Sequence, residues 1–228
     1  MIRLRWFQVE PVSRLLAALA GVPTRNRNDR AAEDEWFEHS RVSKNRVEST
    51  FVEKVVVQNE FEDELGNINV FDRVEFRRTE FVVTTDFPQI QLRNSPRSRR
   101  NFLARLGEMS AYEVAIDPVR LDVMSTVSEL ERQIGRLTVK ELTVSGYPLS
   151  ARASAEIVVT GADDVRDDAA RYTRHKYAIV KSASVFLRQR ESTIPCEISL
   201  AGICLGEENV QVERLVRGSL VPEGIREL

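Results

Sequence analysis

Two long stretches decide the fold class of this chain: STFVEKVVVQNEFEDE at residues 49–64 and NVFDRVEFRRTEFVVTTDF at residues 69–87. Both are rich in Val, Phe and Thr, the residue types that favour extended strands. The turn-forming sequence LGNIN at residues 65–69 lies between them, so the two stretches predict an antiparallel hairpin. Apolar and charged residues alternate along residues 70–77, which indicates one apolar face and one charged face.

Helix signals interrupt the strand-like sequence at four places. Proline opens and glycine closes the segments at residues 11–21 and 96–107, and helical spacing of apolar residues marks residues 118–135. Residues 162–175 carry acids first and bases last, the order that suits a helix dipole. The other segments, including NVQVERLVRGSL at residues 209–220, are typical of strands. We therefore predict an α+β fold with mainly antiparallel sheet and about four helices.

The segment PTRNRNDRAAEDEWFEHSRVSKNR, residues 23–46, is polar and charged. It predicts either a long surface loop or a loop that holds one short helix at about residues 31–37. Trp36 and Phe37 are expected to attach it to the body of the protein, because two adjacent aromatic residues seldom both face water.

The chain is expected to have two halves, which form either one continuous domain or two. Residues 1–109 hold a strand, a helix, the polar loop, the hairpin and a basic helix, and residues 110–228 hold the remaining strands and two helices. VEPVSRLL at residues 9–16 and IDPVRLDV at residues 116–123 share the order apolar, acid, Pro, Val, which suggests a duplicated β-α-β-β unit. The alternative is coincidence, because an acid and a proline suit any helix start.

Composition excludes several classes of protein. The 33 basic and 35 acidic residues leave a formal net charge of −2, so any nucleic-acid binding must use a local basic patch. Arg3, Arg5, Glu10 and Arg14 interrupt the apolar residues near the start, so we expect no signal peptide. No apolar run approaches the ~20 residues of a membrane-spanning helix.

The two cysteines, Cys196 and Cys204, are expected to be buried thiols rather than a disulfide or half of a metal site, because a zinc site needs about four ligands. Such low cysteine usage suits a reducing cytoplasm, where we expect the protein to reside.

Enzyme signatures are missing: the sequence contains no GxGxxG, GxxxxGK[ST], GxSxG, HExxH or paired CxxC motif. We therefore expect a non-enzymatic protein with no cofactor. The weaker alternative is a metal-dependent hydrolase that uses Asp163, Asp164, Asp167 and Asp168. Acids in a first helical turn are favoured by the helix dipole without any metal, and this structural interpretation is preferred.

An arginine cluster is the most informative candidate site. Residues 88–107 contain five arginines and no acid: Arg93, Arg97, Arg99, Arg100 and Arg105. Asn94 or Ser95 can cap a helix here, with Pro96 in its first position and Gly107 at its end. Arginine at a helix start opposes the dipole, so the cluster indicates a site suited to an anion such as phosphate. The alternative is a solvated basic helix balanced by acids elsewhere, such as NEFEDE at residues 59–64.

We expect the protein to bind nucleic acid, with Arg97, Arg99 and Arg100 contacting phosphates, Arg93 and Arg105 flanking them, and Arg25 and Arg27 of the polar segment adding contacts. The partner can be DNA or RNA, and no membrane is expected. The alternative function is a structural or adaptor subunit of a larger assembly, with another protein or further copies of this chain as partners.

Overall fold

The computed structural model describes residues 1–22, 34–62, 64–96, 98–189 and 192–220. The chain folds as two compact units. The N-terminal unit consists of residues 9–116, and the C-terminal unit consists of residues 1–8 together with residues 117–228. The chain passes between the units within β1 (Ile2–Glu10) and within β6 (Ala115–Pro118).

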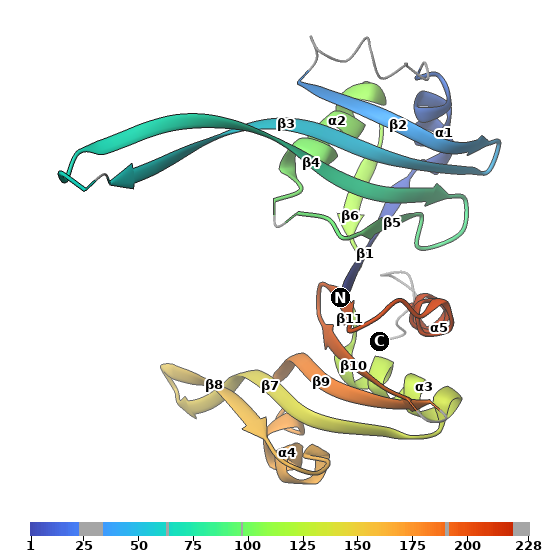
Figure 1. Cartoon of the computed structure of the whole chain (residues 1–228). Coiled ribbons are helices and arrows are strands. Elements are labelled where there is room, and N and C mark those ends of the chain that lie inside the picture. Colours follow the sequence, from blue (N-terminus) through green and yellow to red (C-terminus); the bar gives the residue numbers. More distant parts are fainter. Residues whose placement is uncertain (23–33, 63, 97, 190–191, 221–228) are drawn as a thin grey trace. The chain divides into compact units, whose positions relative to one another are not determined.

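The N-terminal unit is built on an antiparallel sheet in the order β2-β3-β4-β5 (Figure 1). Its elements are α1 (Val12–Ala20), β2 (Glu35–Ser43), β3 (Arg46–Glu62), β4 (Ile68–Thr84), β5 (Ile90–Arg93) and α2 (Arg100–Met109). Phe51, Phe81 and Phe102 form the centre of its core, and the Phe81 and Phe102 ring centroids lie 5.0 Å apart. The core therefore joins α2 to one face of the sheet.

The C-terminal unit has a second antiparallel arrangement in the order β1-β11-β10-β9-β7-β8. Its elements are α3 (Val123–Ile134), β7 (Leu137–Ser150), β8 (Ala153–Thr160), α4 (Arg166–Thr173), β9 (Ile179–Gln189), β10 (Ser192–Ser199), β11 (Gly202–Leu205) and α5 (Val210–Ser219). Helix α3 packs against β7, β9, β10 and α5. The apolar side chains that alternate along these strands are buried toward α3.

The α+β class with a large antiparallel sheet is confirmed, and the described residues form five helices. The hairpin is confirmed as β3 and β4, which pair in unbroken register from Arg46 opposite Thr84 to Glu62 opposite Ile68. No helix in the described ranges is long and apolar enough to cross a membrane.

The predicted strand at residues 209–220 is wrong, because this segment forms α5. The Asn209 side chain accepts a hydrogen bond from the Val212 backbone N–H at 3.0 Å and so caps the helix. Val212 and Val216 are both buried, and their spacing of four residues is a helical one. The alternation of valines at its start is too short to indicate a strand.

The helix predicted at residues 96–107 is displaced along the chain. Helix α2 begins at Arg100 and has no side-chain cap, because Asn94 takes a left-handed conformation (φ 52°) and turns the chain after β5. Gly107 does not end it either: the Ser110 hydroxyl donates to the Leu106 and Gly107 carbonyls at the actual end. Burial of Phe102 and Leu106 one turn apart determines the helix position.

The prediction of a polar loop, with or without a short helix, fails from residue 35 onward, because residues 35–43 form strand β2. Residues 23–33 lie outside the described residues. Phe37 attaches β2 to the core, as expected, and its ring lies 5.3 Å from that of Phe51. Trp36 lies on the opposite face of the sheet, where it packs edge-on against Phe76.

Candidate nucleic-acid interface

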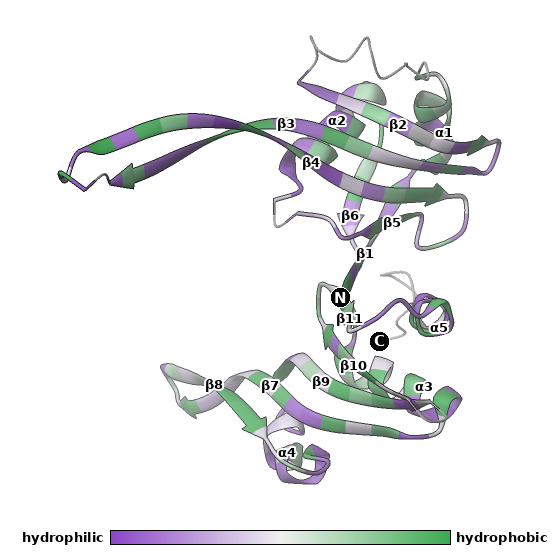
Figure 2. Cartoon of the chain, viewed as in Figure 1, coloured by the Kyte–Doolittle hydropathy of each residue, from purple (hydrophilic) through white to green (hydrophobic). Residues whose placement is uncertain are grey.

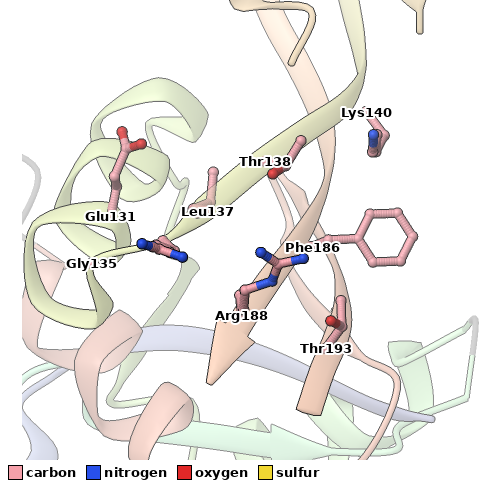
Figure 3. Close-up of a pocket in the computed structure, with 9 residues that line it drawn as sticks. Glu131, Gly135, Leu137, Thr138, Lys140, Phe186, Arg188 and Thr193 are labelled. Atoms are coloured by element: carbon pink, nitrogen blue, oxygen red, sulfur yellow. The ribbon is translucent and has the colours of Figure 1, made fainter. Parts of the chain in front are cut away.

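A groove of about 530 Å³ lies on the outer face of the C-terminal sheet (Figure 3). Its chemistry comes from three cations, one aromatic ring and two hydroxyls: Arg136, Lys140, Arg188, Phe186, Thr138 and Thr193. Helix α3 covers the other face of the same strands, so the groove and the core are on opposite sides of one sheet.

Strand register brings the lining residues together. Thr138 of β7 pairs with Phe186 of β9, and Arg188 of β9 pairs with Thr193 of β10. The Arg188 backbone N–H donates to the Arg136 carbonyl at 3.0 Å, which places the two arginines in neighbouring positions across the strands. Their sequence neighbours Val139, Val185, Leu187 and Ile194 are buried, and so the alternation of side chains turns the groove residues outward.

Lys140 reaches the groove through an irregularity in the sheet. The register between β7 and β9 shifts between Val139 and Glu141, so Lys140 has no partner in the β7–β9 register. Its Nζ donates to the Ala162 carbonyl, and this contact holds the ammonium group at the edge of the groove. An ammonium has three donors, so two remain for a ligand.

The groove contains one acid, Glu131 of α3, and that acid is already paired. Arg166, the first residue of α4, donates from Nη2 to Glu131 at 2.9 Å and also binds Asp164 at 2.9 Å. The hydrogen bond from Arg166 holds the pKa of Glu131 below its ordinary value. Burial acts to raise the pKa of Asp164, but hydrogen bonds from Arg166 and the Val139 backbone outweigh it, and that pKa is also lowered.

The two groove arginines are available for a ligand. Arg136 and Arg188 are exposed, and within the described part of the chain neither guanidinium forms an ion pair or a hydrogen bond. The Phe186 ring is 36% exposed. A planar base can stack on this ring while guanidinium and ammonium groups bind neighbouring phosphates. Proteins that bind single-stranded nucleic acids without sequence preference combine these two kinds of contact.

A second surface of the same unit also combines rings with cations. Tyr147 of β7 packs against Tyr172 at the end of α4, with ring centroids 5.4 Å apart, and against His175 at 5.6 Å. Tyr177, which is 61% exposed, extends this ring cluster beside His175. The cations of Arg171 and Lys176 lie 4.5 and 4.6 Å from the ring centroids of Tyr172 and Tyr177.

The predicted arginine cluster is only partly described. Arg97, Arg25 and Arg27 fall in residues outside the described ranges. Arg93 is half-buried in β5, opposite Glu80 of β4. The remaining three lie around the start of α2: Arg99 immediately before it, exposed Arg100 at its first position, and Arg105 in its second turn.

The charge of Arg105 is partly neutralised, because its guanidinium forms an ion pair with Glu108 at 3.0 Å. Arg99 Nη1 and Arg105 Nε are both buried without a hydrogen-bond acceptor, and burial lowers the pKa of the Arg99 guanidinium. Ser95 Oγ is likewise buried without a partner. The structure therefore places Arg99 and Arg100 next to each other at an uncapped helix start and leaves Arg105 in a separate contact.

Of the four acids considered as metal ligands, Asp164 has structural contacts, whereas Asp163, Asp167 and Asp168 are exposed. Asp164 binds Arg166 and accepts from the Val139 backbone N–H at 3.1 Å, which links the start of α4 to β7. Asp167 and Asp168 lie in the first turn of α4, where the dipole favours them. In the described ranges, no group of three His, Cys, Asp or Glu side chains is arranged to hold a metal ion.

Sequence reasoning did not single out the groove residues. Thr138 and Lys140 alternate with buried residues in RLTVK, and Phe186 and Arg188 do so in VFLR. Following the outward-facing positions of each strand could have identified both pairs as exposed. Only the pairing of β7 with β9 and β10 shows that they share one groove.

Comparison of the chain with the models of known protein families and with curated protein sequences found no match, so the residues themselves carry the functional argument.

Proposed function

We propose that the protein binds single-stranded nucleic acid through the groove of the C-terminal unit. One observation carries the proposal: three cations and an exposed aromatic ring line one groove whose single acid is already paired with Arg166. Arg136, Lys140 and Arg188 bind phosphates, and Phe186 stacks on a base. A concave groove with a stacking ring favours single strands over a duplex, whose bases are already stacked on one another.

The decisive measurement is fluorescence anisotropy of labelled single-stranded DNA and RNA of mixed sequence at low salt. The R136E/R188E variant is expected to weaken binding about a hundredfold, because two phosphate contacts become repulsive. Phe186→Ala is expected to weaken it about tenfold through lost stacking, and Phe186→Trp is expected to restore it.

The matched control is R120E/R214E, which makes the same change in charge at two exposed arginines of this unit that do not line the groove. The control is expected to bind almost as the unaltered protein does. The proposal fails if no probe binds at low salt, or if the control loses as much affinity as the groove variant.

The arginines around the start of α2 keep their predicted role as an anion-binding surface. Arg99 and Arg100 are the described residues best placed for it, since Arg105 is paired with Glu108. The expected cytoplasmic location, the duplicated β-α-β-β unit and the absence of catalysis and cofactors all stay predictions.

A second candidate function, subunit of a larger protein assembly, rests on a different observation. The outer parts of β3 and β4 form a two-stranded arm that extends beyond the rest of the N-terminal unit (Figure 1). A projecting arm of this kind is suited to contact with another protein molecule.

A further inference from the structure

In the described part of the sheet, no third strand pairs with the arm, residues 54–62 and 64–76. At its base the Lys54 backbone N–H donates to the Asp34 carbonyl at 2.7 Å, immediately before β2. Strand β2 accompanies β3 only as far as the Glu35–Glu53 pair, and β5 accompanies β4 only from Glu80 onward. Beyond these points β3 and β4 pair only with each other in the described sheet, over about 30 Å at the usual strand rise.

Apolar and polar residues alternate along the arm, as the green and purple bands of the ribbon in Figure 2 show, and many of the apolar side chains are exposed. Seven of them are between 49% and 69% exposed: Val56, Phe61, Ile68, Val70, Phe71, Val74 and Phe76. Val56 and Val74 lie directly opposite each other on one face, and Phe61 packs against Phe71 on the other. An isolated two-stranded ribbon is only marginally stable in water, so its exposed apolar residues indicate a surface covered by a partner.

The charge of the arm indicates what kind of surface its partner must have. Residues 55–72 contain five acids and no base. Glu60, Glu62, Glu64 and Asp72 are exposed on the outer arm. A surface that covers the apolar residues must therefore also supply cations.

The complementary surface lies in the same unit. Residues 88–107 contain five arginines and no acid, and Arg99 has a buried Nη1 without an acceptor beside exposed Arg100. The arm runs away from α2 of its own chain (Figure 1), so its acids and these arginines are not brought together within one molecule.

We propose that the arm of one molecule docks on Arg99 and Arg100 of a second copy of this chain. The contact is head-to-tail, because the docking element and its receptor are different surfaces, and it extends into a ring or a filament. It deepens the second candidate function, the assembly subunit, and does not require that the groove of the C-terminal unit bind nucleic acid.

Analytical ultracentrifugation of nuclease-treated protein tests this proposal over a concentration series at low and high salt. The unaltered protein is expected to associate as concentration rises and to dissociate in high salt. E60K/E62K and R99E/R100E are each expected to weaken association about tenfold or more, and R100E alone, at an exposed position, to weaken it in the same direction. The combined variant E60K/E62K/R99E/R100E is expected to regain association, because the reversed charges again attract.

The matched control is E10K/D86K, which reverses two exposed acids of the same unit outside the arm and is expected to associate normally. Three results would each overturn the proposal: monomer at every concentration, association unchanged by both charge reversals, or no recovery in the combined variant. If R99E/R100E weakens nucleic-acid binding but leaves association intact, the arginines contact phosphates and the proposal is wrong. Failure of the groove proposal is measured separately: the labelled nucleic acid would show no rise in anisotropy with the unaltered protein, whatever its self-association.

Discussion

Glu35 and Glu53 are directly opposite each other on β2 and β3, on the face of the sheet that packs against α2. Glu53 is only 8% exposed. Burial raises the pKa of Glu35, and the neighbouring charge of Glu53 raises it further, while Arg105 acts in the opposite direction. Like charges directly opposite in a ladder are destabilising, so this pair is a weak point of the N-terminal unit. Arg77 lies opposite Glu53 on β4.

Glu35→Gln is therefore expected to stabilise the protein at neutral pH. A carboxyl whose folded pKa is raised lowers the free energy of unfolding as pH rises from its unfolded value near 4.5 through its folded value. Glutamine removes that loss, and because Glu35 is partly exposed we expect a gain below about 1 kcal/mol. Urea unfolding of both proteins measures this gain in the free energy of unfolding at two pH values, one neutral and one below the ordinary glutamate pKa. The gain should vanish at the lower pH. Glu60→Gln, at an exposed position of β3 opposite Val70, is the control and should change nothing.

At the scale of elements, α1, α3 and the hairpin follow from sequence periodicity, because their buried faces repeat with the helix or strand period. Helix α4 follows from the acids at its start and the base at its end. The sequence-based prediction fails where tertiary contacts determine whether and where a helix forms. Helix α2 begins at Arg100 because Phe102 and Leu106 fill the core, and not where Asn94 and Pro96 give a favourable helix start. Helix α5 forms because Val212 and Val216 are buried and Asn209 caps it.

Arg166 links two of these elements, since it joins the start of α4 to Glu131 of α3. Arg166→Ala is expected to lower the free energy of unfolding by about 1 to 2 kcal/mol, because it leaves two partly buried carboxylates without a cation. The lowered pKa values of Glu131 and Asp164 also predict a pH dependence. Their stabilising contribution is complete above the ordinary values of 4.5 and 3.8 and is lost as pH falls through the lower folded values.

Chemical unfolding across the acid range checks this prediction. The unaltered protein should lose stability in that range more steeply than Arg166→Ala, because the variant lacks the guanidinium hydrogen bonds that lower the pKa of Glu131 and help to lower that of Asp164. Arg132→Ala is a suitable control, because Arg132 pairs with Glu129 on the exposed surface of the same helix α3 and contributes little. Equal pH profiles for the Arg166 variant and the unaltered protein would contradict the assigned role of Arg166.

At the scale of the whole molecule, the near-neutral net charge conceals strongly segregated charge. Residues 55–72 of the sequence contain acids and no base, residues 88–107 contain arginines and no acid, and the groove of the C-terminal unit carries three cations. Each region presents one sign of charge to a partner, so total charge is a poor guide to what this protein binds.

The groove makes a quantitative prediction about salt. Three cations that each neutralise one phosphate of a single strand should give a slope of about −2 in a plot of log affinity against log salt concentration. R136E/R188E should reduce the magnitude of that slope by more than half, whereas Phe186→Ala should lower affinity and leave the slope unchanged. Anisotropy titrations at several salt concentrations measure both. A slope near zero for the unaltered protein would show that phosphates are not the main contact.

The sequence by itself determined the fold class, the hairpin and most helices, because local periodicity states which faces must be buried. It also showed the acid-only and base-only segments, since charge can be read without coordinates. Only the tertiary structure decided that Arg136, Lys140, Phe186 and Arg188 line one groove, because residues of β7 and β9 become neighbours through strand register, which the sequence of either strand does not contain. The exposed arm was decided in the same way: its strands have the sequence of ordinary sheet strands, and only the ranges of β2 and β5 show that, among the described residues, no third strand pairs with its outer part.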